Sequence, residues 1–159
     1  MKIVLPFLLL IIVNLGFAQS FSISELVRIS KYDDDTFDTY VTKKGYIFYE
    51  ESEEEIASRT TYTFLVSGRR KYFVTKYIPK NKNYYWVNFQ TPNSSTYLKI
   101  KEELKTSGYL LIDKGSIHGS PYYTYKKDGK EITLISESEE NEYTKQTTVT
   151  YEIGVSVYY

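Results

Sequence analysis

The stretch KKGYIFYE, residues 43–50, has a counterpart in TSGYLLID, residues 106–113. In both, a segment with helix-like spacing precedes a Gly-Tyr pair, and apolar residues follow it. Glycine suits the end of a helix because it adopts the left-handed conformation without the penalty of a Cβ atom. We therefore expect Gly45 and Gly108 to close two helices, and Tyr46 and Tyr109 to begin two strands.

Three segments have the apolar spacing of amphipathic helices, as in the pair Ile23 and Leu26 of the first. Ser22 is the expected N-cap of that helix, and Ser94 or Ser95 is the expected N-cap of the third. The predicted helical segments are residues 21–32, 33–45 and 94–108.

Alternation of apolar and polar residues predicts strands after each Gly-Tyr pair. Ser67-Gly68 and Asp128-Gly129 are turn signals, and Asp-Gly is typical of a two-residue hairpin. We interpret the acidic runs EESEEE (50–55) and ESEENE (137–142) as solvated turns or strand ends. The predicted strands are residues 46–49, 61–66, 71–78, 84–89, 110–112, 121–127, 130–136 and 148–159.

The order of these elements is the same in the two halves of the chain. The separation of Gly45 from Gly108 is close to that of the turn glycines Gly68 and Gly129, which favours a duplication. We predict an α+β fold of two imperfect helix-then-four-strand repeats, residues 19–92 and 93–159. They would form an antiparallel sheet with the helices on one face. An ordinary α+β domain without a duplication is the alternative.

The N-terminus has the features of a secretory signal. Lys2 precedes an apolar run from Ile3 to Val13, and small residues at Gly16 and Ala18 suit signal peptidase. The run is shorter than the ~20 residues that span a bilayer as a helix. We therefore predict a signal peptide over residues 1–18, no retained membrane span, and a single domain over residues 19–159 that is exported to the periplasm or the extracellular space.

The predicted order resembles that of exported domains with the β-lactamase-inhibitor-protein fold. The resemblance covers about residues 21–159 and rests on the element order and on Gly45-Tyr46 and Gly108-Tyr109. It implies helices packed on one side of a continuous antiparallel sheet, whose exposed concave face binds a partner protein. The best-known members carry disulfides in their repeats, whereas this chain has no cysteine.

The residue inventory disfavours most catalytic chemistries. One histidine, His118, and no cysteine leave too few ligands for zinc, and His118 lies in the loop-like stretch KGSIHGSP. Aspartates 33, 34, 35 and 38 could suit calcium, but they lack the spacing of a calcium loop and fit a helix start. Equal numbers of basic and acidic residues, 20 each, give no general attraction to nucleic acid. We expect no enzyme, metal or cofactor.

Tyrosine is the unusual residue, with 18 in the chain. A helix layer covers one face of a sheet, so aromatic side chains on the other face would be exposed and would favour an interaction site. We predict a non-catalytic module that docks a partner protein in the cell envelope; a small hydrolase of envelope polymers and a structural envelope protein are the alternatives. Alternation leaves open which parity is exposed. The candidate binding residues are Tyr72, Tyr85, Trp86, Tyr123 and Tyr125.

Overall fold

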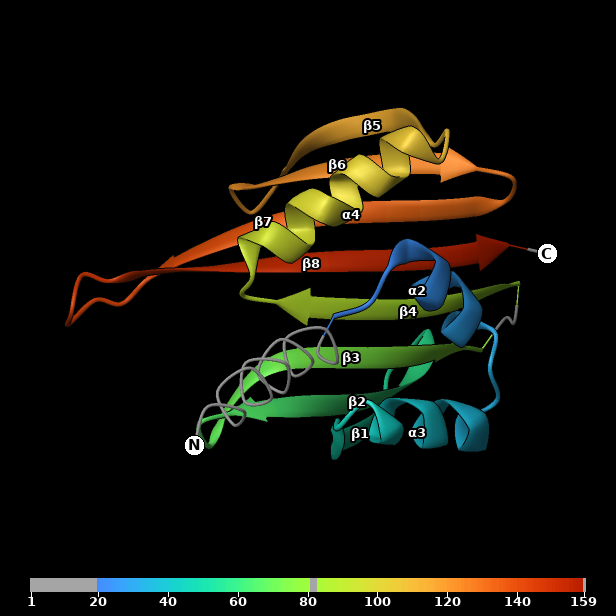
Figure 1. Ribbon diagram of the computed structural model, residues 1–159, viewed down its shortest axis with the longest axis horizontal. Coiled ribbons are helices and arrows are strands. Elements are labelled where there is room, and N and C mark those ends of the chain that lie inside the picture. The colour runs from blue at the N-terminus through green and yellow to red at the C-terminus, as the bar shows by residue number, and fades with distance from the viewer. Residues whose placement is uncertain (1–19, 81–82, 159) are drawn as a thin grey trace, which may run out of the picture.

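The computed structural model describes residues 20–80 and 83–158, so the predicted signal peptide at residues 1–18 lies outside the described part (Figure 1). Within it, three helices and eight strands confirm the α+β class. The helices are α2 (Ile23–Ser30), α3 (Asp34–Lys43) and α4 (Ser94–Thr106).

All eight strands form one antiparallel sheet with the order β1-β2-β3-β4-β8-β7-β6-β5. Two four-stranded meanders therefore meet where β4 pairs with β8, and β1 and β5 are the edges. The strands are β1 (Ile47–Glu53), β2 (Ala57–Val66), β3 (Arg69–Pro79), β4 (Tyr84–Thr91), β5 (Leu110–Ile117), β6 (Ser120–Lys127), β7 (Lys130–Glu140) and β8 (Thr147–Tyr158).

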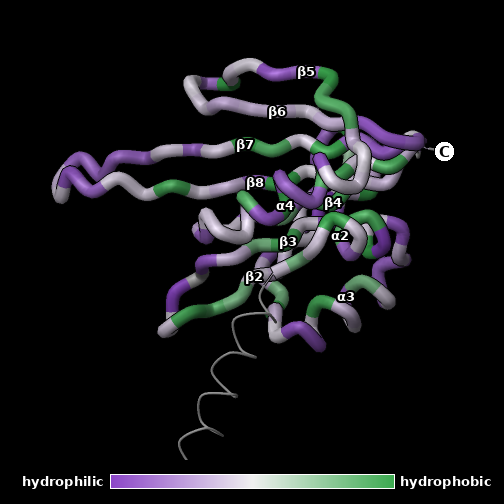
Figure 2. Tube along the Cα trace, turned by 45° about the horizontal axis from the view of Figure 1, so that its top comes forward, coloured by the Kyte–Doolittle hydropathy of each residue, from purple (hydrophilic) through white to green (hydrophobic). Residues whose placement is uncertain are grey.

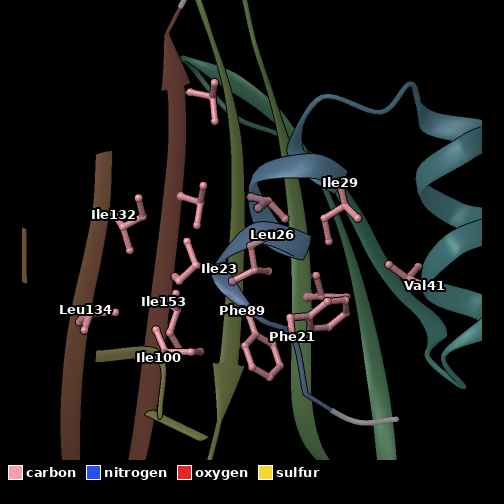
Figure 3. Close-up of a cluster of buried hydrophobic side chains, with 14 of the residues drawn as sticks. Phe21, Ile23, Leu26, Ile29, Val41, Phe89, Ile100, Ile132, Leu134 and Ile153 are labelled. Atoms are coloured by element: carbon pink, nitrogen blue, oxygen red, sulfur yellow. The ribbon is translucent and has the colours of Figure 1, made fainter. Parts of the chain in front are cut away.

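The helices lie on one face of this sheet, in front of the strands in Figure 1. Helix α2 packs on β4 and β8, and α4 spans the same two strands. Leu26 and Ile29 of α2 are fully buried, and they belong to one cluster with Phe89 and Ile153 of the sheet (Figure 3). Phe21 precedes α2 and packs edge-on against Phe89, at 5.1 Å between ring centroids. The core is therefore centred on the join between the two meanders.

Side chains cap the start of each helix. Ser22 and Glu25 form the expected capping box of α2, and Asp33 caps α3 by accepting a hydrogen bond from the backbone N–H of Thr36. The prediction for α4 was wrong by one or two residues, because Asn93 is its cap. An asparagine oxygen accepts from the first-turn N–H groups as well as a serine hydroxyl does.

The two Gly-Tyr pairs end helices in the same way. Gly45 and Gly108 have φ angles of +88° and +76°, and both follow a helix directly after its C-cap residue. Tyr46 donates its backbone N–H to the carbonyl of Val41, and Tyr109 does so to Leu104. This is the bond of a Schellman cap, which requires a left-handed residue before it.

The strands reach further than expected. β5 continues through Ile117, so His118-Gly119 is not part of a long loop but a tight turn with both φ angles positive. The acidic runs are mostly strand, since β1 ends at Glu53 and β7 at Glu140. Figures 1 and 2 show that the hydrophilic end of the β7–β8 hairpin projects beyond the rest of the sheet. Charged residues fit there because both faces of the hairpin are exposed.

Glu25 ties α2 to α3. Its carboxylate accepts hydrogen bonds from Lys44 Nζ at 2.8 Å, from the Tyr40 hydroxyl at 2.7 Å and from the backbone N–H of Ser22 at 3.0 Å. Burial by itself raises the pKa of Glu25, but these bonds outweigh it and hold the pKa at about 2. The network is therefore stabilising only while Glu25 is ionised.

The two cap glycines differ in what an added methyl group would meet. A Cβ at Gly45 would lie 2.9 Å from Phe64 Cε2, whereas at Gly108 the nearest atom is Lys127 Nζ at 3.8 Å. We expect Gly108→Ala to lower the free energy of unfolding by about 1–2 kcal/mol, the cost of the left-handed backbone. Gly45→Ala should cost more, because Phe64 must also move. Urea unfolding of both variants tests this, and equal losses would contradict it.

Acid should weaken the Glu25 network. The pKa of Glu25 is lower in the folded protein than its ordinary value of 4.5, so its contribution is present above pH 4.5 and is lost as the pH falls towards 2. Glu25→Gln should lower stability by about 1–3 kcal/mol at pH 7, and the difference from wild type should vanish near pH 2. Urea unfolding at several pH values measures this. A difference that does not change with pH would refute it.

Candidate binding surface on the open face of the sheet

The register divides the side chains of β4 between the two faces. Val87 and Phe89 are fully buried in the core under the helices. Because successive side chains of a strand alternate, Trp86, Asn88 and Gln90 point to the opposite side, which we call the open face. Residues that pair directly across neighbouring strands share a face, so the register assigns the rest of the sheet in the same way.

The structure separates the five predicted binding residues. Only Trp86 lies on the open face. Tyr125 is buried in the core, and Tyr72 and Tyr123 pack against that core from the helix side. Tyr85 pairs with the core residue Val157 and is 38% exposed at the rim of the helix side. The five therefore do not form one surface.

An aromatic cluster surrounds Trp86 on the open face. Tyr77 stacks on Trp86, with ring centroids 3.8 Å apart and planes 13° apart. Tyr84 of β4 and Tyr158 of β8 continue the cluster, at 5.6 Å from each other. Tyr158 is 46% exposed, and the other three are partly exposed. We call these four residues the aromatic patch; it combines the consecutive strands β3 and β4 with β8, which is distant from them in sequence.

Polar side chains occupy the centre of the open face, next to the aromatic patch. Asn88 Nδ2 donates to one oxygen of the Glu152 carboxylate at 2.6 Å, and Gln90 Nε2 donates to the other at 3.1 Å. Asn88 is 7% exposed, and its Oδ1 is buried without a hydrogen-bond partner. Burial and the negative charge of Glu152 both raise the pKa of Tyr77. We call Asn88, Gln90 and Glu152 the central polar cluster.

Two hollows lie near these groups. One, of about 410 Å³, opens beside Gln90 between Phe73 and the projecting β7–β8 hairpin. The other, of about 340 Å³, lies at the ends of β3 and β4 below the α2–α3 connection, where Tyr85 and Lys76 contribute to its lining. Both contain polar and apolar groups, and their volumes suit a side chain or a small molecule.

Lys76 is a buried cation in the second hollow. It is 6% exposed, and its ammonium donates to Asp34 Oδ1 at 2.7 Å and to the backbone carbonyl of Tyr32 at 2.6 Å. The Asp34 side chain, by contrast, is 67% exposed. This ion pair holds the start of α3 against β3, and it leaves Lys76 unsuited to contact a nucleic-acid phosphate.

The histidine and aspartate side chains considered for catalysis or metal binding are exposed in the described part of the chain. His118 is exposed in its hairpin turn. Among the described residues, no group of three or more His, Cys, Asp or Glu side chains is placed to hold a metal ion. In the same part of the chain, no helix has both the length and the apolar character needed to cross a membrane.

Several residues of this surface escaped the sequence prediction. Alternation in YYWVNFQT does place Trp86, Asn88 and Gln90 on one face, so that much was available from the sequence. The position of Glu152 and Tyr158 beside them depends on the pairing of β4 with β8, and no local signal indicates it. In comparisons with known proteins, no family model, no curated protein and no solved structure matches this chain.

The Lys76–Asp34 pair should respond unequally to loss of either partner. Asp34→Ala leaves a buried ammonium with one acceptor, which costs about 1–3 kcal/mol of unfolding free energy. Lys76→Met removes the buried charge and leaves Asp34 in contact with water, so the loss should be smaller. Urea unfolding of both variants at pH 7 measures the difference; a greater loss for Lys76→Met would contradict this account.

Proposed function

We propose that this protein is a non-catalytic binding module whose open sheet face docks a partner protein in the cell envelope. The aromatic patch carries this proposal. Four aromatic side chains from three strands remain partly exposed at one end of a face that no described helix covers. Exposed clusters of tyrosine and tryptophan are typical of protein interfaces, because they bury a large area with few rotatable bonds.

The predicted signal peptide supports a place outside the cytoplasm. The buried core begins at Phe21, three residues after Ala18, where we expect cleavage. Removal of residues 1–18 would therefore keep every helix and strand that the structure describes in the chain. The absence of cysteine is compatible with export because a domain of this size can be stable without disulfides. The exposed position of His118 supports a role that is not catalytic.

We also propose that the two meanders arose by duplication and share the arrangement of the β-lactamase-inhibitor-protein fold. Both begin with a helix that ends in a Schellman glycine followed by tyrosine. Both first strands then have an irregularity three residues after that tyrosine, at Tyr49 and at Ile112. Matching caps and irregularities at matching positions support a common origin more strongly than the strand count does.

Partner binding can be tested with variants on opposite faces. An envelope extract is passed over immobilised wild-type protein, and the captured protein is purified so that its affinity can be measured by calorimetry. Trp86→Ala and Tyr158→Ser should each weaken binding at least about tenfold, as loss of an interface aromatic does. Leu98→Ala on α4, where Leu98 is 61% exposed, is the control and should bind normally. Circular dichroism checks that each variant is folded.

A result in which both folded patch variants bind as wild type does would refute docking on the open face. If Leu98→Ala weakens partner binding as much as the patch variants do, the result would indicate that the interface includes the helix side.

A further inference from the structure

The central polar cluster has more acceptors than donors. Both oxygens of the Glu152 carboxylate accept from uncharged amides, those of Asn88 and Gln90. Among the side chains that the structure describes, no lysine or arginine forms an ion pair with Glu152. A carboxylate can accept about four hydrogen bonds, so Glu152 retains acceptor capacity and a negative charge without a nearby counter-ion.

Asn88 adds a second acceptor to the same place. Its Oδ1 is buried and has no partner. Exchange of the amide oxygen and nitrogen would not relieve this, because it would set Oδ1 against the Glu152 carboxylate at the 2.6 Å contact. A buried acceptor without a donor costs about 1–3 kcal/mol. The free protein therefore carries an unsatisfied acceptor beside a carboxylate.

Two basic side chains of the open face form ion pairs towards its edges. Arg59 pairs with Glu50 at 3.2 Å and with Glu54 at 3.1 Å, towards the β1 edge. Lys126 lies 3.9 Å from Glu131, towards the β5 edge. Neither reaches the middle of the sheet. Lys71 lies beside Phe73 and Gln90 in the first hollow, and it forms no ion pair with Glu152. The charge of Glu152 is therefore complementary to a cation on a docked partner.

There is room for such a group above β8. Gly154 pairs with Asn88 on one side and with Thr133 on the other, and it has no side chain. A Cβ built on Gly154 would meet only the carbonyl oxygen of Thr133, at 3.9 Å. Trp86 lies two pairs further along β4, on the same face, and pairs with Ser156. The gap is thus bordered by an aromatic ring, a carboxylate and the side chain of Asn88, whose Oδ1 is buried.

We propose that the partner docked on the open face presents an arginine side chain to this gap, where its guanidinium donates to Glu152 beside Trp86. A shift of the Asn88 side chain on binding would uncover Oδ1 as a second acceptor. Arginine fits because its planar group carries five N–H donors and a permanent charge and also stacks on aromatic rings. Lysine has the charge but three donors in a compact head group. This inference rests on the proposed function, because the arginine belongs to a docked protein.

A small probe tests the arginine site without the partner. N-acetyl-arginine methylamide is titrated into the purified protein and followed by NMR at the indole N–H of Trp86 and the side-chain amides of Asn88 and Gln90. The chain has one tryptophan, so the indole signal is unambiguous. The citrulline analogue, which has nearly the same shape and no charge, should bind at least about tenfold more weakly, since charged hydrogen bonds are stronger. The lysine analogue should fall between the two.

Two variants locate the site. Glu152→Gln should abolish the preference for arginine over citrulline, while Glu139→Gln on the exposed part of the β7–β8 hairpin should leave it unchanged. Gly154→Val is a second variant that keeps Glu152; its added methyl groups should fill the gap and block the probe. Thermal unfolding confirms that each variant is folded. Equal binding of the arginine and citrulline probes, or an arginine preference that survives in Glu152→Gln, would overturn the proposal.

The affinity of the captured partner for Trp86→Ala and for Glu152→Gln distinguishes this inference from the proposed function. If Trp86→Ala loses the partner and Glu152→Gln keeps it at full affinity, docking on the open face stands and the arginine site is refuted. If both variants keep the partner, docking on the open face is itself refuted. Loss of the partner with both variants, together with an arginine-selective probe, supports both proposals.

Discussion

The antiparallel pairing of β4 with β8 is the interaction on which the rest of the structure depends. It runs from the pair Tyr84 and Tyr158 to the pair Thr91 and Tyr151, and it joins two meanders that are otherwise separate sheets. Phe89 and Ile153, which pair directly, are both fully buried and lie under α2. The β4–β8 pairs join residues that are far apart in sequence, and they are also the pairs that the helices bury. A core formed by two halves of a chain is expected to lie at the contact between them.

A single helix layer leaves the second face of an eight-stranded sheet to be stabilised by its own side chains. Small hydroxyl residues form part of this face: Thr61 bonds to Thr75 at 3.2 Å, and Thr124 bonds to Thr133 at 3.3 Å. These cross-strand pairs satisfy polar groups that neighbouring strands bury. The aromatic patch and the central polar cluster depart from this arrangement, since one leaves apolar area exposed and the other leaves an acceptor unpaired. Such departures are expected where a protein binds something else.

Local features of the fold could be predicted because they arise from residues close in sequence. The capping box at Ser22, the left-handed glycines and the Asp128-Gly129 turn each depend on a few neighbouring residues. The errors occur where local polarity is a poor guide. The sequence left the glutamate runs as turns or strand ends. Glu137 and Glu139 lie in β7, because an exposed strand end accommodates charge on both faces. The polar and glycine-rich stretch around His118 likewise predicts a loop. In the structure, β5 continues to Ile117 and a tight turn follows it.

The sequence by itself determined the class of the fold, the identity of its elements and the residues that end them, because helix caps and strand alternation are local physical effects. It could not decide which parity of each strand is buried, since alternation allows two equivalent choices until the helices take one face. Only the tertiary structure made that choice, and it placed four of the five predicted aromatic residues on the helix side. The register between β4 and β8 then brought Glu152 beside Asn88, because that contact depends on pairing across half the chain.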